Sequence, residues 1–157
     1  ESDLFLAGVR PAINVGISVS RVGGAAQIKS MKKISGTLKL DQAQYRELEA
    51  FSKFGSDLDA ATKSVIDKGA RNVEILKQAQ NSPYRVEDQC AIIFAGTNGL
   101  IMDVPVNKVK EFEADYLSVL KASHSDILSA LKSGKLTDEV VDTLTRVTKE
   151  VASKFAQ

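Results

Sequence analysis

The chain changes character at one stretch, VSRVGGAAQ at residues 19–27. Before this stretch apolar and polar residues alternate, and after it apolar residues recur at helical spacing almost to the end of the chain. Arg21 lies between the alternating segment and the pair Gly23-Gly24. Its guanidinium is a permanently charged planar fork that suits phosphate oxygens, although a loop arginine is more often a solvated surface charge.

Residues 12–19 have the two-residue period of a half-buried strand. The apolar face consists of Ile13, Val15, Ile17 and Val19, and the polar face of Asn14, Gly16, Ser18 and Ser20. No partner strand is recognisable nearby, and a lone strand leaves its backbone hydrogen-bonding groups unpaired. We therefore expect one orphan strand, and we expect the chain to be a piece of a larger protein.

The remaining residues predict a bundle of about six helices. Apolar spacing, together with glycine, proline and capping residues, places them at residues 25–34, 38–54, 56–80, 86–97, 105–133 and from 137 onward. Ser56 and Thr137 are the expected N-caps of two helices, and Gly134 is the expected end of the longest. The helix at residues 86–97 is apolar on nearly all sides, so we expect it to be buried.

The composition is that of an ordinary globular domain: 157 residues, 43% hydrophobic and 26% charged, with a net charge of +1. Acidic and basic side chains are well mixed, so we expect no nucleic-acid partner. The longest apolar run, residues 90–95, is too short to cross a bilayer, so we expect no membrane insertion. We also expect no signal peptide, and the single cysteine favours a reducing, intracellular setting.

Few residues offer self-contained catalysis. We expect His124 to be an ordinary residue inside the longest helix and Cys90 to be a buried thiol, and these two are poor material for a metal site. A Walker A loop needs Gly, four residues and then Gly-Lys-Ser/Thr, and the one Gly-Lys pair, Gly134-Lys135, lacks the rest. The chain alone is therefore expected neither to bind ATP tightly nor to hydrolyse it.

Two stretches resemble the alpha subunit of the F-type ATP synthase: RPAINVGISVSRVGGAAQ at residues 10–27, and AQYRE through FGSDLDAAT at residues 43–62. The resemblance continues in order along the chain. It implies that residues 1–27 are the end of a truncated α/β nucleotide-binding domain, and that residues 28–157 are the C-terminal helical domain. The implied fold class is mainly α, a helical bundle preceded by the orphan strand.

The same resemblance implies catalytic roles for two residues. Arg21 matches the arginine finger that the alpha subunit extends into the catalytic site of the neighbouring beta subunit. Ser18 matches a position that the family requires for activity, although its residue type also fits an ordinary polar strand position. Val19 and Ser20 lie on the approach to Arg21 and are expected to face nucleotide.

A second implied site is the non-catalytic nucleotide site of the alpha subunit, which takes ATP or ADP. Phe5, Arg10 and Pro11 match residues near the adenine, and Gln78 and Gln80 match the pair beneath it. Without the resemblance, the two glutamines would be ordinary residues at a helix end. The phosphate loop would lie upstream, so only half of this site is expected here, and Mg²⁺ would bind only together with the upstream domain.

The implied partners are the beta subunits and the central gamma shaft, near which residues 54–59 are expected to lie. The implied role is that of a regulatory, non-catalytic subunit in proton-driven rotary ATP synthesis. The expected location is peripheral, on the cytoplasmic face of a bacterial inner membrane or on the matrix side of the mitochondrial one. The alternative is a non-enzymatic helical interaction module that shares the same ancestry.

Overall fold

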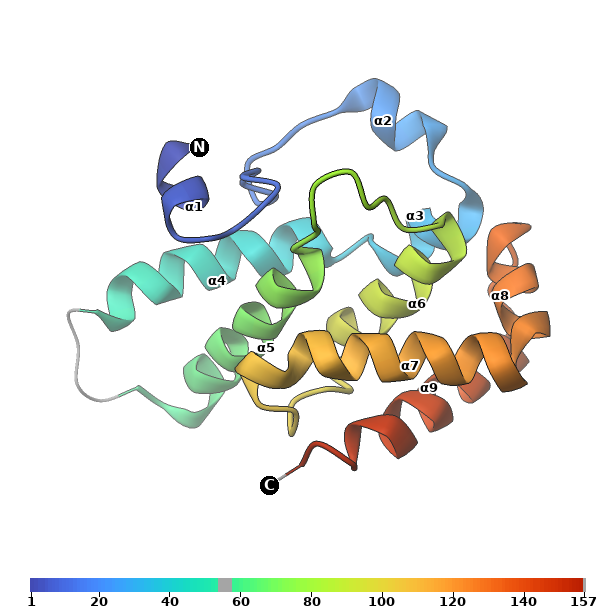
Figure 1. Cartoon of the computed structure of the whole chain (residues 1–157). Coiled ribbons are helices and arrows are strands. Elements are labelled where there is room, and N and C mark those ends of the chain that lie inside the picture. Colours follow the sequence, from blue (N-terminus) through green and yellow to red (C-terminus); the bar gives the residue numbers. More distant parts are fainter. Residues whose placement is uncertain (54–57, 157) are drawn as a thin grey trace.

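The computed structural model describes residues 1–53 and 58–156, and these residues form a mainly helical domain (Figure 1). In chain order its elements are α1 (Ser2–Leu6), α2 (Arg21–Ala26), α3 (Lys29–Ile34), α4 (Leu38–Ser52), α5 (Ala60–Leu76), α6 (Val86–Thr97), the 3₁₀ helix η1 (Val106–Lys108), α7 (Val109–Ser123), α8 (Ser125–Lys132) and α9 (Asp138–Ala152). The prediction of a mainly α fold is confirmed.

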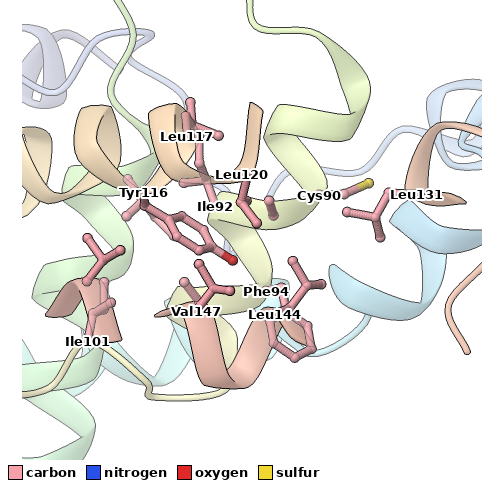
Figure 2. Packing of buried hydrophobic residues seen from close by; sticks show 14 of the residues in the cluster. Cys90, Ile92, Phe94, Ile101, Tyr116, Leu117, Leu120, Leu131, Leu144 and Val147 are labelled. Carbon is pink, nitrogen blue, oxygen red and sulfur yellow. The ribbon is translucent and has the colours of Figure 1, made fainter. Parts of the chain in front are cut away.

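Helix α6 lies at the centre of the bundle and contacts α3, α5, α7, α8 and α9. Cys90 and Ala91 are fully buried in it, and Phe94 and Ala95 are nearly so. Figure 2 shows Cys90 and Phe94 of this helix together with Leu120 from α7 and Leu144 from α9, all members of one hydrophobic cluster. The predicted bounds and the predicted burial of this helix are both confirmed, because its apolar residues leave no polar face for solvent.

Helices α4 and α5 pack against each other on one side of the bundle, and α7 packs against α9 on the other (Figure 1). The first pair is in close contact at Gly69, where a Cβ atom would overlap the ring of Tyr45. Within α7, Phe112 stacks on Tyr116 with ring centroids 5.4 Å apart, and it meets Phe155, which follows the end of α9, edge-on. Aromatic packing of this kind adds to the stabilisation that burial already provides.

The predicted strand at residues 12–19 is not confirmed, since no strand occurs among the described residues. The segment instead forms turns, including a bond in which the Ser18 amide donates to the Asn14 carbonyl at 3.0 Å. Ile17 and Val19 are 70% and 81% exposed. A strand needs a neighbour to satisfy its backbone groups, and the described chain offers none here.

Two predicted helices are each divided. The helix expected at residues 25–34 is replaced by α2 and α3, because Ser20 starts a helix earlier by accepting a hydrogen bond from the Gly23 amide at 3.0 Å. Gln27 and Ile28 then adopt extended backbone angles between the two. The helix expected at residues 105–133 divides at His124, whose φ of −138° and ψ of 41° are not helical. The placement of His124 inside a helix was therefore wrong.

The remaining boundaries agree with expectation more closely. Helix α5 is capped by Asp59, which accepts a bond from the Thr62 amide at 2.8 Å, and it ends at Leu76 instead of residue 80. The predicted cap Ser56 lies outside the described residues. Thr137 caps α9 as predicted. Gly134 ends the preceding helical segment with a φ of 82°, a conformation that glycine adopts without strain.

Candidate functional site

The corner at residues 18–21 is exposed throughout. Arg21 is the first residue of α2, and Ser20 caps that helix. Figure 1 shows α2 at the periphery of the fold, connected by extended segments on both sides. Arg21 is thus presented to solvent on a short capped helix, and Ser18 and Val19 form the exposed approach to it.

The residues predicted to lie near adenine are brought together at the other end of the N-terminal segment. The Arg10 guanidinium carbon lies 4.1 Å from the ring centroid of Phe5, the geometry of a cation–π contact. Phe5 is 50% exposed as a residue, so part of its surface remains available to another planar group. The backbone carbonyl of Arg10 accepts a hydrogen bond from the backbone amide of Gln78 at 2.8 Å.

Gln78 and Gln80 lie on the linker between α5 and α6, and both are exposed. The predicted helix end at residue 80 does not exist, because the backbone is already extended at Lys77. The bond to Arg10 therefore joins the linker to the N-terminal segment. Of the predicted adenine group, Phe5, Arg10 and Gln78 are joined by contacts, and Gln80 follows on the same linker.

A cavity of about 350 Å³ lies beside this group, between the N-terminal segment and helices α4 and α5. Its walls include Leu4, Pro11, Ile13, Tyr45, Val73 and Lys77. Pro11 thus contributes to the cavity wall next to Arg10. An apolar hollow with a few polar groups is the usual form of a small-molecule site.

Sequence reasoning missed a set of side chains that hold the linker from α7. Glu113 is 2% exposed, and it accepts a hydrogen bond from the Tyr84 hydroxyl and a second from Lys110 Nζ at 2.8 Å. Burial and the bond to Glu113 raise the pKa of Tyr84 to about 12. The available signal was a glutamate four residues after Val109 on the buried face of α7.

Cys90 and the described His, Asp and Glu side chains are the remaining candidates for reactive or metal-binding groups. Cys90 is buried, as predicted, and burial raises the pKa of its thiol. Within residues 1–53 and 58–156 no group of three His, Cys, Asp or Glu side chains could hold a metal ion. None of the described helices combines the length and the apolar character needed to span a membrane.

Comparison with known proteins places the chain in a family. The family model described as "ATP synthase alpha/beta chain, C terminal domain" matches residues 27–151. The protein named ATP synthase subunit alpha from Christiangramia forsetii is 72% identical over 98% of this chain, and that from Flavobacterium johnsoniae is 66% identical over 99%. The corresponding protein of Azobacteroides pseudotrichonymphae is 56% identical over 99%.

The chain spans about 30% of the length of these relatives. Identity of this degree over nearly the whole chain exceeds what a shared fold alone would require. These alignments cover 98% and 99% of the chain, which is more than the residues 27–151 that the family model matches. The chain belongs to the ATP synthase alpha/beta chain family and corresponds to the C-terminal part of its alpha subunits.

Proposed function

We propose that this chain acts as the C-terminal part of an F-type ATP synthase alpha subunit, contributing one residue to catalysis on a neighbouring beta subunit and half of a nucleotide site of its own. The observation that carries the proposal is the 72% identity to a protein named ATP synthase subunit alpha over 98% of the chain. The alternative of a non-enzymatic helical interaction module that shares this ancestry has no comparable observation in its favour.

The proposed catalytic contribution is made by Arg21. During phosphoryl transfer, negative charge spreads over the equatorial oxygens of the transferred group, and a guanidinium supplied from another subunit offsets it. In GTPases such an arginine accelerates the reaction by about 10³–10⁵-fold, or about 4–7 kcal/mol of barrier. The exposure of Arg21 at the start of α2 supports this role, since a buried or ion-paired side chain could not reach a second subunit.

Ser18 is proposed as a neighbour of that contact, and Val19 and Ser20 as residues that face the nucleotide. All three are exposed on the same corner. The Ser20 hydroxyl already accepts a bond from the Gly23 amide, which fixes the first turn of α2 and with it the base of the Arg21 side chain. Ser20 therefore has a local structural role in addition to the proposed contact.

The proposed non-catalytic site takes the adenine base of ATP or ADP between the N-terminal segment and the linker. The half-exposed ring of Phe5 and the guanidinium of Arg10 suit the face of a planar base, and the exposed amides of Gln78 and Gln80 suit its polar edge. Pro11 adds apolar surface beside them. The chain contains no phosphate loop, so the phosphates and Mg²⁺ would be held by the upstream part of the subunit.

The proposed partners are beta subunits, which hold the substrate that Arg21 serves, and the gamma shaft at the centre of the assembly. Proton-driven rotation would couple the complex to ATP synthesis. Because the relatives named above are bacterial, the cytoplasmic face of the bacterial inner membrane is the favoured location over the mitochondrial matrix. The chain alone would show no ATP turnover above background.

The test replaces Arg21 in a complex assembled from full-length alpha, beta and gamma subunits. Arg21→Ala should lower multisite ATP turnover by about a thousandfold without preventing assembly, and Arg21→Lys should recover only part of it because an ammonium lacks the bidentate fork. Arg146→Ala, which removes an exposed arginine from α9, should leave turnover unchanged. Turnover near the wild-type rate in Arg21→Ala would show the assignment to be wrong.

A further inference from the structure

The linker at residues 77–85 is tied to α7 near both of its ends. At its beginning, Lys110 Nζ donates to the Lys77 carbonyl oxygen at 2.6 Å. At its far end, the Tyr84 hydroxyl donates to Glu113 Oε1. Lys110 and Glu113 are themselves joined at 2.8 Å. One lysine–glutamate pair on α7 therefore holds both ends of the segment that carries Gln78 and Gln80.

Glu113 is the anchor of this arrangement because it is buried. A buried carboxylate is costly unless its oxygens are hydrogen-bonded, and charge-assisted bonds are the strong ones. Both of its oxygens are occupied, Oε1 by Tyr84 and Oε2 by Lys110. Moving the linker away would break the Tyr84–Glu113 bond and the bond from Lys110 to the Lys77 carbonyl together, so its position is coupled to that of α7.

Three further contacts act on the same linker. The Gln89 side chain donates to the Tyr84 carbonyl oxygen at 2.9 Å, and the Gln78 amide donates to the Arg10 carbonyl oxygen at 2.8 Å. Lys110 Nζ also lies 6.0 Å from the ring centroid of Tyr84. The linker is thus held by α6 and α7 on one side and by the N-terminal segment on the other.

We propose that Lys110 and Glu113 are positioning residues for the nucleotide site: they fix the α5–α6 linker so that Gln78 and Gln80 are presented to the base. This inference rests on the proposed non-catalytic site. Neither residue is proposed to touch nucleotide. They act through the backbone at Lys77 and through the side chain of Tyr84.

The chain offers a matched control two residues away. Lys108 and Glu111 form an ion pair with the same three-residue spacing and the same 2.8 Å distance, but both side chains are exposed. By contrast, Glu113 is only 3% exposed in its side chain. Substituting the outer pair removes equal charge from the same part of the chain without touching the linker.

The experiment measures binding of MgATP and of inorganic tripolyphosphate to the full-length alpha subunit by calorimetry. Lys110→Met and Glu113→Gln should raise the dissociation constant for MgATP by about 3- to 30-fold. Tripolyphosphate, which has no base, should bind as it does to the unmodified subunit. Lys108→Met and Glu111→Gln should change neither constant, and Lys110→Arg should retain most of the affinity for MgATP.

The ratio of the two constants separates positioning from general destabilisation, because a poorly folded subunit would lose affinity for both ligands. Tyr84→Phe, which removes a single hydroxyl, provides a mild variant should Glu113→Gln fail to fold. It should weaken MgATP binding in the same direction and by a smaller factor. Equal losses for MgATP and tripolyphosphate would overturn the inference.

The substitutions Gln78→Ala and Gln80→Ala distinguish failure of the proposed nucleotide site from failure of the positioning role alone. If they leave MgATP binding unchanged, the glutamines do not contact the base, and the proposed site fails together with the inference. If they weaken it while Lys110→Met and Glu113→Gln do not, the site stands and the positioning role is overturned. Weakening by both sets of substitutions supports both.

Discussion

Large apolar side chains are mostly exposed in residues 1–28 and mostly buried in residues 86–152. The first segment, all of it described, buries one of them, Leu4, and exposes six others: Phe5, Leu6, Ile13, Ile17, Val19 and Val22. The second segment supplies most of the hydrophobic core. Both have the apolar content of a folded chain, so the difference lies in whether each apolar face has a surface to pack against. The corner at residues 18–21, with its proposed catalytic role, belongs to the segment whose apolar side chains lack such a surface.

The largest expected effect in this comparison comes from truncating one apolar side chain in each segment to alanine. Leu144→Ala should lower the free energy of unfolding by about 2–5 kcal/mol because it opens a cavity in the core. Ile17→Ala removes a similar volume from an exposed turn and should change it by less than about 0.5 kcal/mol. Urea denaturation followed by circular dichroism measures both. Equal effects would show that residues 12–19 pack against the body in solution.

Glycine-to-alanine substitutions give a second pair. At Gly69 the added methyl group would overlap the ring of Tyr45, so Gly69→Ala should cost about 1–3 kcal/mol of stability. At Gly24, inside α2, a Cβ meets nothing within 4 Å, so Gly24→Ala should be neutral or gain up to about 1 kcal/mol through helix propensity. Thermal unfolding distinguishes them. A loss at Gly24 would indicate that α2 is packed.

Alkaline pH should act on the body of the fold first, because all three tyrosines lie outside residues 1–28. The pKa of Tyr84 is raised to about 12 by burial and Glu113, and burial also raises the pKa of Tyr45 and Tyr116. The folded state thus favours the protonated hydroxyl. For Tyr84, the resulting contribution to the free energy of unfolding is complete below pH 10, the ordinary tyrosine pKa. This contribution is lost as the pH rises toward 12.

Tyr84→Phe should make this loss of stability with pH less steep between pH 10 and 12. Denaturant titrations at several alkaline pH values, with absorbance to follow tyrosine ionisation, provide the measurement. An unchanged slope would mean that Tyr84 ionises equally well in the folded state, and hence that its bond to Glu113 is weak.

The smallest expected effects come from the two helix caps. Thr137→Ala should cost about 1 kcal/mol because α9 packs into the core. Ser20→Ala removes a bond of 3.0 Å from a six-residue exposed helix, and unfolding of α2 need not disturb the body. We expect less than about 0.5 kcal/mol globally, together with faster amide exchange at Gly23. A global loss equal to that of Thr137→Ala would contradict this view of α2.

Sequence patterns predicted the helix bounds correctly where those bounds depend on neighbouring residues of the same helix. The apolar run from Val86 to Thr97, the cap at Thr137 and the stop at Gly134 all lie where the pattern predicts. Each of these features depends on side chains within a few residues of one another. Their agreement is therefore expected from capping and periodicity alone.

The features that the sequence did not predict depend on contacts between residues far apart in the chain. Alternation at residues 12–19 specifies two faces but no partner, so the strand was not confirmed. The break at His124 allows Ile127 and Leu131 on α8 to bury their side chains in the core, which periodicity along one helix could not indicate. Glu113 and Tyr84 meet across 29 residues of sequence. The roles of Arg21 and Ser18 stay predictions from resemblance.

Because Cys90 is buried, the reactivity of its thiol can be used to follow unfolding of the bundle. Its thiol is 0% exposed, faces the Ser30 hydroxyl at 3.8 Å, and has a pKa raised by burial, so the reactive thiolate is scarce and shielded while α6 is in place. The sequence contains no second cysteine to confuse the signal. The rate at which an alkylating reagent consumes this thiol therefore measures how often the centre of the bundle opens.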